Sequence, residues 1–108
     1  MEIKSLKQQL QQQADLKDYL KKFNLRIVDL LIINELNQID NNITLHVLNN
    51  LLNNCYHQSE LSQSIKKLIR LNYCSKHRNK QDERTLTITV NDNQKANIKH
   101  VLTKAEHI

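Results

Sequence analysis

Apolar residues recur every three or four positions in five stretches of the chain, and this spacing predicts five α-helices. Residues 3–22 carry a single apolar stripe, as an amphipathic helix does. Residues 25–39 are apolar almost all round, which is typical of a helix buried at the centre of a domain. The other helices are expected over residues 43–54, over residues 57–71, and from an N-cap at Asp92 to residue 108.

Two further stretches, residues 73–78 and 85–90, are predicted to form β-strands. The second is the clearer one, because Leu86, Ile88 and Val90 fall on one face and threonines fall on the other. The whole order predicts a mostly α domain with a small β-hairpin. This is a winged helix-turn-helix, with the order α-α-α-α-β-β-α.

The chain contains no glycine and no proline, so Asn, Asp, Ser or Thr must form its turns. Thr44 is a predicted helix N-cap, with Ile43 and Leu48 on either side of it as a hydrophobic staple. Asn72 stands where a helix usually ends on a left-handed glycine. We therefore expect asparagine to occupy left-handed backbone positions.

The helix expected over residues 57–71 has the sharpest division between its two sides. Leu61, Ile65 and Leu68 line one side, and the other is polar and cationic with Glu60 as its only acid. Such a helix fits the major groove of DNA, where Ser and Gln bond base edges and Lys and Arg neutralise phosphates. The candidate contacts are Ser59, Ser62, Gln63, Lys66, Lys67 and Arg70.

The net charge supports a nucleic-acid partner. The 108 residues predict one domain, 1–108. They include 16 Lys and Arg against 11 Asp and Glu, a net charge of +5 with a pI near 9.3. Residues 41–84 hold seven of the basic residues and three of the acidic ones. This balance favours an anionic partner, although an ordinary solvated surface also produces it.

The turn between the two strands is strongly charged, and a wing with such a tip can lie along the DNA backbone. Arg84 is the candidate to enter the minor groove, because a narrow, AT-rich groove attracts Arg. Asp82 is expected to hold Arg84 or Arg78 by a salt bridge. The alternative is a solvated turn whose charges only prevent edge pairing. The candidate contacts of the hairpin are Lys76, Arg78, Lys80, Asp82 and Arg84.

The first and last helices, within residues 1–22 and 91–108, are expected to contribute to a homodimer. Ile3, Leu6 and Leu10 lie beyond what a compact winged helix needs. Two-fold symmetry would place two recognition helices roughly 34 Å apart, about one turn of DNA. The alternative is that both stripes cover the protein's own core. The candidate interface residues are Ile3, Leu6, Leu10, Val101 and Leu102.

The run 75-SKHRNKQDERTLTITV-90 resembles the wing of the staphylococcal accessory regulator (SarA-type) branch of the MarR family. That wing has a Ser-Lys-x-Arg strand, a turn and an Asp-Glu-Arg-Thr block. The similarity extends back through 21-KKFNL-25 and forward through 92-DNQKANI-98. It implies a homodimeric transcription regulator that binds AT-rich promoter DNA, with its dimer made by the first and last helices.

The resemblance also implies roles for single residues. The helix matching residues 58–71 would read the major groove, the wing Arg matching Arg84 would enter the minor groove, and Arg78 matches the strand Arg of the family. Asn72 departs from the Gly of many MarR relatives. Several family members sense oxidation through one cysteine near the N-terminus, and neither cysteine of this chain occupies that position.

Other chemistry is not favoured by the sequence. Cys55-x-His57 and Cys74-x-x-His77 resemble a zinc-ligand set, but the intervening helix would hold the pairs roughly 20 Å apart, too far for one metal or for a disulfide. Two small, partly buried thiols are expected instead. No catalytic set has a usable spacing, and without glycine no phosphate loop forms. No metal, cofactor or small-molecule ligand is expected, and no enzymatic activity.

The sequence predicts a cytoplasmic, nucleoid-associated protein. MEIKSLKQQLQQQ has no apolar core of a signal peptide, and no apolar run approaches the length of a membrane span. Two alternatives to a sequence-preferring regulator stay open. One is a protein–protein module that pairs with another regulator through the first and last helices. The other is a nucleoid architectural protein with little sequence preference.

Overall fold

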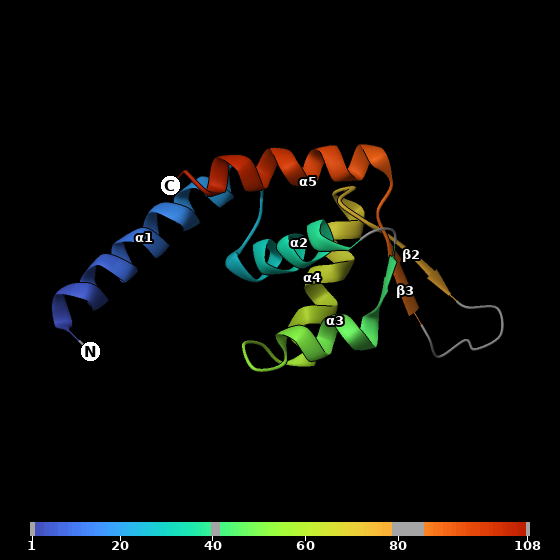
Figure 1. The fold of residues 1–108 in the computed structure, drawn as a ribbon, viewed down its shortest axis with the longest axis horizontal. Coiled ribbons are helices and arrows are strands. Elements are labelled where there is room, and N and C mark those ends of the chain that lie inside the picture. The colour runs from blue at the N-terminus through green and yellow to red at the C-terminus, as the bar shows by residue number, and fades with distance from the viewer. Residues whose placement is uncertain (1, 40–41, 79–85, 108) are drawn as a thin grey trace.

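The computed structural model describes residues 2–39, 42–78 and 86–107 of the chain. Those residues form five helices and three strands, and all five helices predicted from the periodicity are confirmed. In chain order, the elements are α1 (Ile3–Lys21), α2 (Ile27–Gln38), β1 (Asn42–Thr44), α3 (Leu45–Leu52), α4 (Gln58–Arg70), β2 (Ser75–Arg78), β3 (Leu86–Thr89) and α5 (Asp92–Ala105). Figure 1 shows α5 lying across the domain and α1 extending away from it.

The sheet contains a strand that the periodicity did not predict. It is antiparallel with the order β1-β3-β2, and Ile43 of β1 stands opposite Ile88 of β3. Both side chains are buried. β1 is only three residues long and runs directly into α3, so its single apolar residue gave no alternation to detect. The winged helix-turn-helix order is confirmed, with β1 added before α3.

β2 and β3 form the hairpin of the wing, and Arg78 of β2 stands opposite Leu86 of β3. Its connecting residues, 79–85, lie outside the described residues. Three of the candidate DNA contacts, Lys80, Asp82 and Arg84, therefore have no described position. The expected salt bridge of Asp82 lies outside the described residues as well.

The core is centred on α2, as its nearly uniform apolarity predicted. Ile32, Ile33 and Leu36 are completely buried, and both α4 and α5 pack against this helix. Val101 and Leu102 of α5 belong to the same core, with only 1% and 9% of their surfaces exposed. The expectation that these two residues form a dimer interface is therefore wrong, because both are already buried in the core of this chain.

The helix ends follow the predicted turn chemistry with one correction. Thr44 caps α3, since its hydroxyl accepts a hydrogen bond of 3.2 Å from the Val47 amide. The cap of α5 is Asn91 and not Asp92. Asn91 Oδ1 accepts from the Gln94 amide at 2.8 Å, and Gln94 Oε1 accepts from the Asn91 amide at 2.9 Å. This reciprocal pair is a capping box, which the side chain at position 92 is one residue too late to make.

Candidate nucleic-acid interface

The polar side of α4 faces solvent. The buried side chains on its opposite side are Leu61, Ile65 and Leu68, which pack into the core with α2. Ser62 is half-buried at the edge of the polar side. Of the candidate DNA contacts on α4, four are exposed: Ser59, Gln63, Lys66 and Arg70. Burial of the apolar side thus presents two hydrogen-bonding groups and two cations outward.

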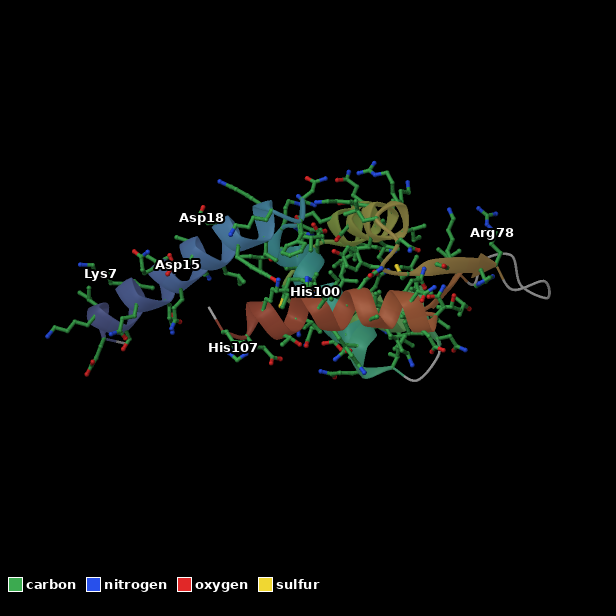
Figure 2. All side chains as sticks on the ribbon, turned by 90° about the horizontal axis from the view of Figure 1, so that it is seen from above. Lys7, Asp15, Asp18, Arg78, His100 and His107 are labelled. Carbon is green, nitrogen blue, oxygen red and sulfur yellow. The ribbon has the colours of Figure 1, made fainter. Side chains whose placement is uncertain are left out.

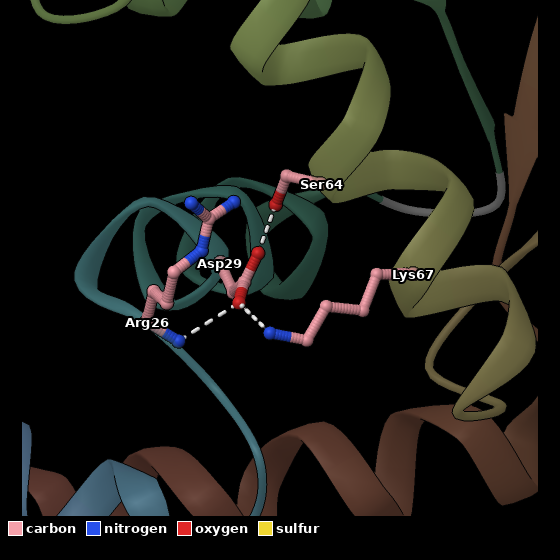
Figure 3. Close-up of polar contacts among 4 residues, drawn as sticks. All are labelled: Arg26, Asp29, Ser64 and Lys67. Carbon is pink, nitrogen blue, oxygen red and sulfur yellow. Dashed lines mark hydrogen bonds and ion pairs between the residues drawn. The ribbon is translucent and has the colours of Figure 1, made fainter.

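Lys67 does not belong to this exposed side. Its Nζ atom lies 2.8 Å from Oδ2 of Asp29, and only 17% of the lysine side chain is exposed. Figure 3 shows the lysine reaching back from α4 towards α2. The expectation that Lys67 neutralises a DNA phosphate is therefore wrong for this arrangement, because the positive charge is already paired inside the protein.

Asp29 was missed by the sequence reasoning. Its carboxylate is completely buried. It accepts hydrogen bonds from the Ser64 hydroxyl, from the Lys67 ammonium and from the Arg26 backbone amide, the last at 2.8 Å (Figure 3). The available signal was an acid in the first turn of α2 between the apolar residues Val28 and Leu30, because a buried carboxylate needs partners. We call Asp29, Ser64 and Lys67 the Asp29 cluster.

The strand β2 supplies a second group of exposed polar side chains. Lys76, His77 and Arg78 are all exposed along it, and Arg78 lies at the wing end of the molecule in Figure 2. β2 follows α4 after a corner of only four residues, 71–74. The cationic side chains of the wing strand therefore lie close in sequence to the C-terminal end of α4.

A buried amide fixes this corner. Asn72 has the left-handed backbone expected of it, with φ of 68°. Gln94 of α5 is 2% exposed, and its Nε2 donates to Asn72 Oδ1 at 3.2 Å and to Ser75 Oγ at 2.9 Å. Asn97 also donates to the Asn72 carbonyl at 3.3 Å. These bonds join the end of α4, the start of β2 and the first turns of α5. Glycine at position 72 would lack the side-chain oxygen that accepts from Gln94.

The apolar residues at the start of α1 are exposed. Ile3, Leu6 and Leu10 are 84%, 40% and 57% exposed, and Figure 2 shows Lys7 on the outer part of α1, far from Arg78. The end of α1 is anchored, since Leu20 is completely buried and the Tyr19 hydroxyl donates to a backbone oxygen of α5. The α1 stripe covers the protein's own core only at this anchored end.

Two open hollows lie along α1 and α5. The larger has a volume of about 480 Å³ and includes Tyr19, Phe23 and Lys104 in its lining. The second, about 400 Å³, lies further out along α1, between residues such as Leu16 and Ala105. Both hollows are open to solvent. The larger lies at the anchored end of α1, and the second lies nearer to the exposed apolar part of the helix.

The two thiols differ sharply. Cys55 is exposed, so the expectation that both are partly buried is wrong, and Cys74 is buried. Burial raises the pKa of the Cys74 thiol from 9.0 to about 12, because the thiolate would lose its hydration. Within residues 2–39, 42–78 and 86–107, no group of three His, Cys, Asp or Glu side chains is placed to hold a metal ion. No helix in these ranges is long and apolar enough to cross a membrane.

Comparisons with known proteins agree on one family. The family model described as transcriptional regulator SarA/Rot matches residues 15–101. The HTH-type transcriptional regulator SarR of Staphylococcus aureus, found in strains including USA300 and COL, is 33% identical over 92 residues, which is 83% of this chain and 77% of SarR.

Solved structures share the fold at low sequence identity. AbfR of Staphylococcus epidermidis, in a structure of its reduced form bound to DNA, superimposes with a TM-score of 0.77 at 20% identity, over 96% of this chain and 71% of AbfR. AbsC, a MarR family transcriptional regulator from Streptomyces coelicolor, gives 0.77 at 17% identity, over 96% and 70%. MarR of E. coli in its apo form gives 0.72 at 12% identity, over 99% and 80%.

Proposed function

Since the chain belongs to the SarA/Rot family of transcriptional regulators, we propose that it binds AT-rich promoter DNA with sequence preference as a homodimer. Family membership makes it a DNA-binding regulator of the winged-helix class and not an enzyme. Beyond family membership, the proposal concerns the base preference, the dimer, and which DNA contacts are made by α4 and which by the wing.

The outward polar side of α4 is the observation that carries the proposal. Gln63 and Ser59 are exposed hydrogen-bonding groups of the kind that bond base edges in the major groove. Lys66 and Arg70 lie on the same side and would neutralise phosphates, which gives affinity without sequence preference. The structure of AbfR bound to DNA supports this, because a protein of the same fold binds DNA.

The wing would make the second contact. Lys76 and Arg78 are exposed on β2, and Lys80 and Arg84 follow in the connection to β3. We assign Arg84 to the minor groove, with Asp82 holding it or Arg78 in place. A narrow AT-rich groove has a strongly negative potential, so an inserted Arg favours AT-rich sequence without bonding particular bases.

The dimer would form through α1. Ile3, Leu6 and Leu10 are exposed apolar residues on an extended helix, and the two hollows beside α1 and α5 offer room for a partner helix. Burying these side chains against a second copy would remove apolar surface from water, which is favourable. Val101 and Leu102 are not part of this interface, since they are already in the core.

The test combines a binding titration with a mass measurement. Fluorescence anisotropy with AT-rich and GC-rich duplexes of equal length should show tighter binding to the AT-rich one, with affinity falling steeply as salt rises. Sedimentation velocity should give the mass of a dimer. Equal affinity for both duplexes would instead favour a nucleoid architectural protein, and no binding would favour a protein–protein module.

A further inference from the structure

The Asp29 cluster places an ion pair between α2 and α4 where apolar packing surrounds it. Asp29 is completely buried and Lys67 is mostly buried, while the neighbours of Asp29 on α2 include the core residues Val28 and Ile32. Removing such charges from water is costly, and well-packed apolar residues often serve stability equally well or better. The cluster therefore calls for a role besides holding the two helices together.

The position of the cluster on α4 suggests that role. Ser64 and Lys67 are three residues apart, so they lie nearly above one another, separated by about 60° around the helix axis. Ser64 is buried and Lys67 is half-buried, which places the pair at the border between the buried and exposed sides. Hydrogen bonds are directional, so the bonds from Ser64 and Lys67 to Asp29 resist rotation of α4 about its axis. Apolar contacts alone lack that directionality.

The rotation of α4 decides which side chains are presented outward. Gln63 directly precedes Ser64, and Lys66 directly precedes Lys67. In each pair the first residue is exposed while the second is held by Asp29. If α4 turned about its axis, Gln63 would move away from the position from which it can bond a base.

The cluster also controls charge. A free Lys67 would lie about 100° from Lys66 around the helix and would add a cation beside the exposed side. Phosphate contacts of this kind strengthen binding to every sequence equally. In the structure the Asp29 carboxylate neutralises this ammonium at 2.8 Å, so the outer side of α4 keeps only Lys66 and Arg70 as its cations among the described residues.

We propose that Asp29 is a positioning residue for DNA recognition, which fixes the rotation of α4 through Ser64 and Lys67 and keeps the Lys67 charge from DNA. The inference rests on the proposed function, because it concerns how α4 is presented to a duplex. Asp29 itself touches no DNA. Its effect is to raise the ratio of sequence-selective to non-selective binding.

The experiment compares two duplexes of equal length and base composition. One is recovered by selection from a random AT-rich library with the wild-type protein, and the other is its scrambled version. The affinity ratio and the slope of log K against log salt are measured for wild type, Asp29→Asn, Lys67→Met, and the double variant with both changes. Lys66→Met is the matched control, because it removes the neighbouring but exposed lysine.

In Asp29→Asn, the released Lys67 should steepen the salt slope by about 0.9 per protomer, since it can then reach a phosphate. The affinity ratio should fall about tenfold, comparable to the loss of one base contact. Lys66→Met should flatten the slope by about 0.9 per protomer, whereas Lys67→Met should leave it unchanged. The double variant leaves no unpaired charge at the cluster. It therefore tests the affinity ratio between the two duplexes even if Asp29→Asn alone does not fold.

A purely structural role predicts a different result. Loss of folded protein lowers the active fraction equally for both duplexes, so the ratio and the salt slope would stay as in wild type. A wild-type ratio in Asp29→Asn or in the double variant would overturn the proposal, as would a flattened slope in Lys67→Met. Failure of the proposed function is separate, because wild type itself would then bind no duplex selectively.

Discussion

The side-chain amide of Gln94 donates a hydrogen bond of 3.2 Å to the side-chain oxygen of Asn72, at the corner where α4 turns into the wing. The same amide bonds Ser75, the first residue of β2. Gln94 is 2% exposed, so water does not readily replace these partners. The orientation of the wing relative to α4 therefore depends on a residue of the last helix.

Replacing Gln94 with Leu should loosen the corner. Leu has a similar size but leaves the Asn72 and Ser75 oxygens without this donor, at a cost of about 1–3 kcal/mol in the free energy of unfolding. Urea unfolding followed by circular dichroism measures that cost. Asn97→Leu is the control, since its bond to the Asn72 backbone is exposed. An equal loss in the two variants would contradict a special role for the buried amide.

Asn72 itself should tolerate Gly better than Ala. Its φ of 68° suits glycine, so Asn72→Gly loses only the bond to Gln94, about 0.5–1.5 kcal/mol. Asn72→Ala loses that bond and adds the steric cost of a left-handed Cβ, about 1 kcal/mol more. Asn24 has φ of 59°, and Asn24→Gly is the matched control, expected to be nearly neutral. Thermal unfolding of the four proteins tests the order.

The two thiols should react at very different rates. Cys55 is exposed and should be alkylated by iodoacetamide in the folded protein, whereas Cys74 should react only after unfolding. Mass spectrometry of the folded and urea-treated protein counts the modified sites. Rapid modification of both thiols in the folded protein would show that the region around Cys74 opens readily.

The raised pKa of Cys74 predicts a loss of stability in alkali. The unfolded thiol ionises near pH 9.0, while the folded thiol holds its proton until a pH of about 12. The stabilising contribution is therefore fully present below pH 9 and falls by about 1.4 kcal/mol for each pH unit above it. Tyr73, whose pKa burial also raises, adds to the slope at higher pH. Just above pH 9, the free energy of unfolding of Cys74→Ala should fall less steeply with pH than that of wild type. This holds even if the two proteins differ in stability at neutral pH.

Gln63→Ala should relax base preference more than it weakens binding in general. Gln63 is exposed on α4, and a base contact is worth about 1–3 kcal/mol, so the affinity ratio between selected and scrambled duplexes should fall about tenfold. The salt slope should not change, because no phosphate contact is lost. Gln38→Ala, an exposed position at the end of α2, is the control. An unchanged ratio in Gln63→Ala would remove this residue from base recognition.

Leu10→Glu should separate the proposed dimer. A carboxylate on the exposed apolar part of α1 would have to be buried against the second copy without a partner, which is unfavourable. The variant should sediment as a folded monomer and bind DNA more weakly. Gln8→Glu introduces the same charge on the same helix outside the Leu10 stripe and should leave the dimer intact. Dimers of equal strength in both variants would locate the interface elsewhere.

The sequence by itself determined the winged-helix order. Helical periodicity placed five helices within a few residues of their ends, because burial of one side requires an apolar residue every three or four positions. The division of α4 into two sides followed from the same spacing. In a chain without glycine, Asn72 was left as the residue best able to take the left-handed corner.

Only the tertiary structure decided the residues at the borders of these patterns. Lys67 lies between the two sides of α4, and its direction is set by Asp29, which is 38 residues away in sequence. Val101 and Leu102 have the same apolar character as Leu10, but α5 lies against α2 whereas the start of α1 extends beyond the core. β1 exists because Ile43 meets Ile88 across the sheet. Local spacing records which residues share a side, and distant partners determine what that side contacts.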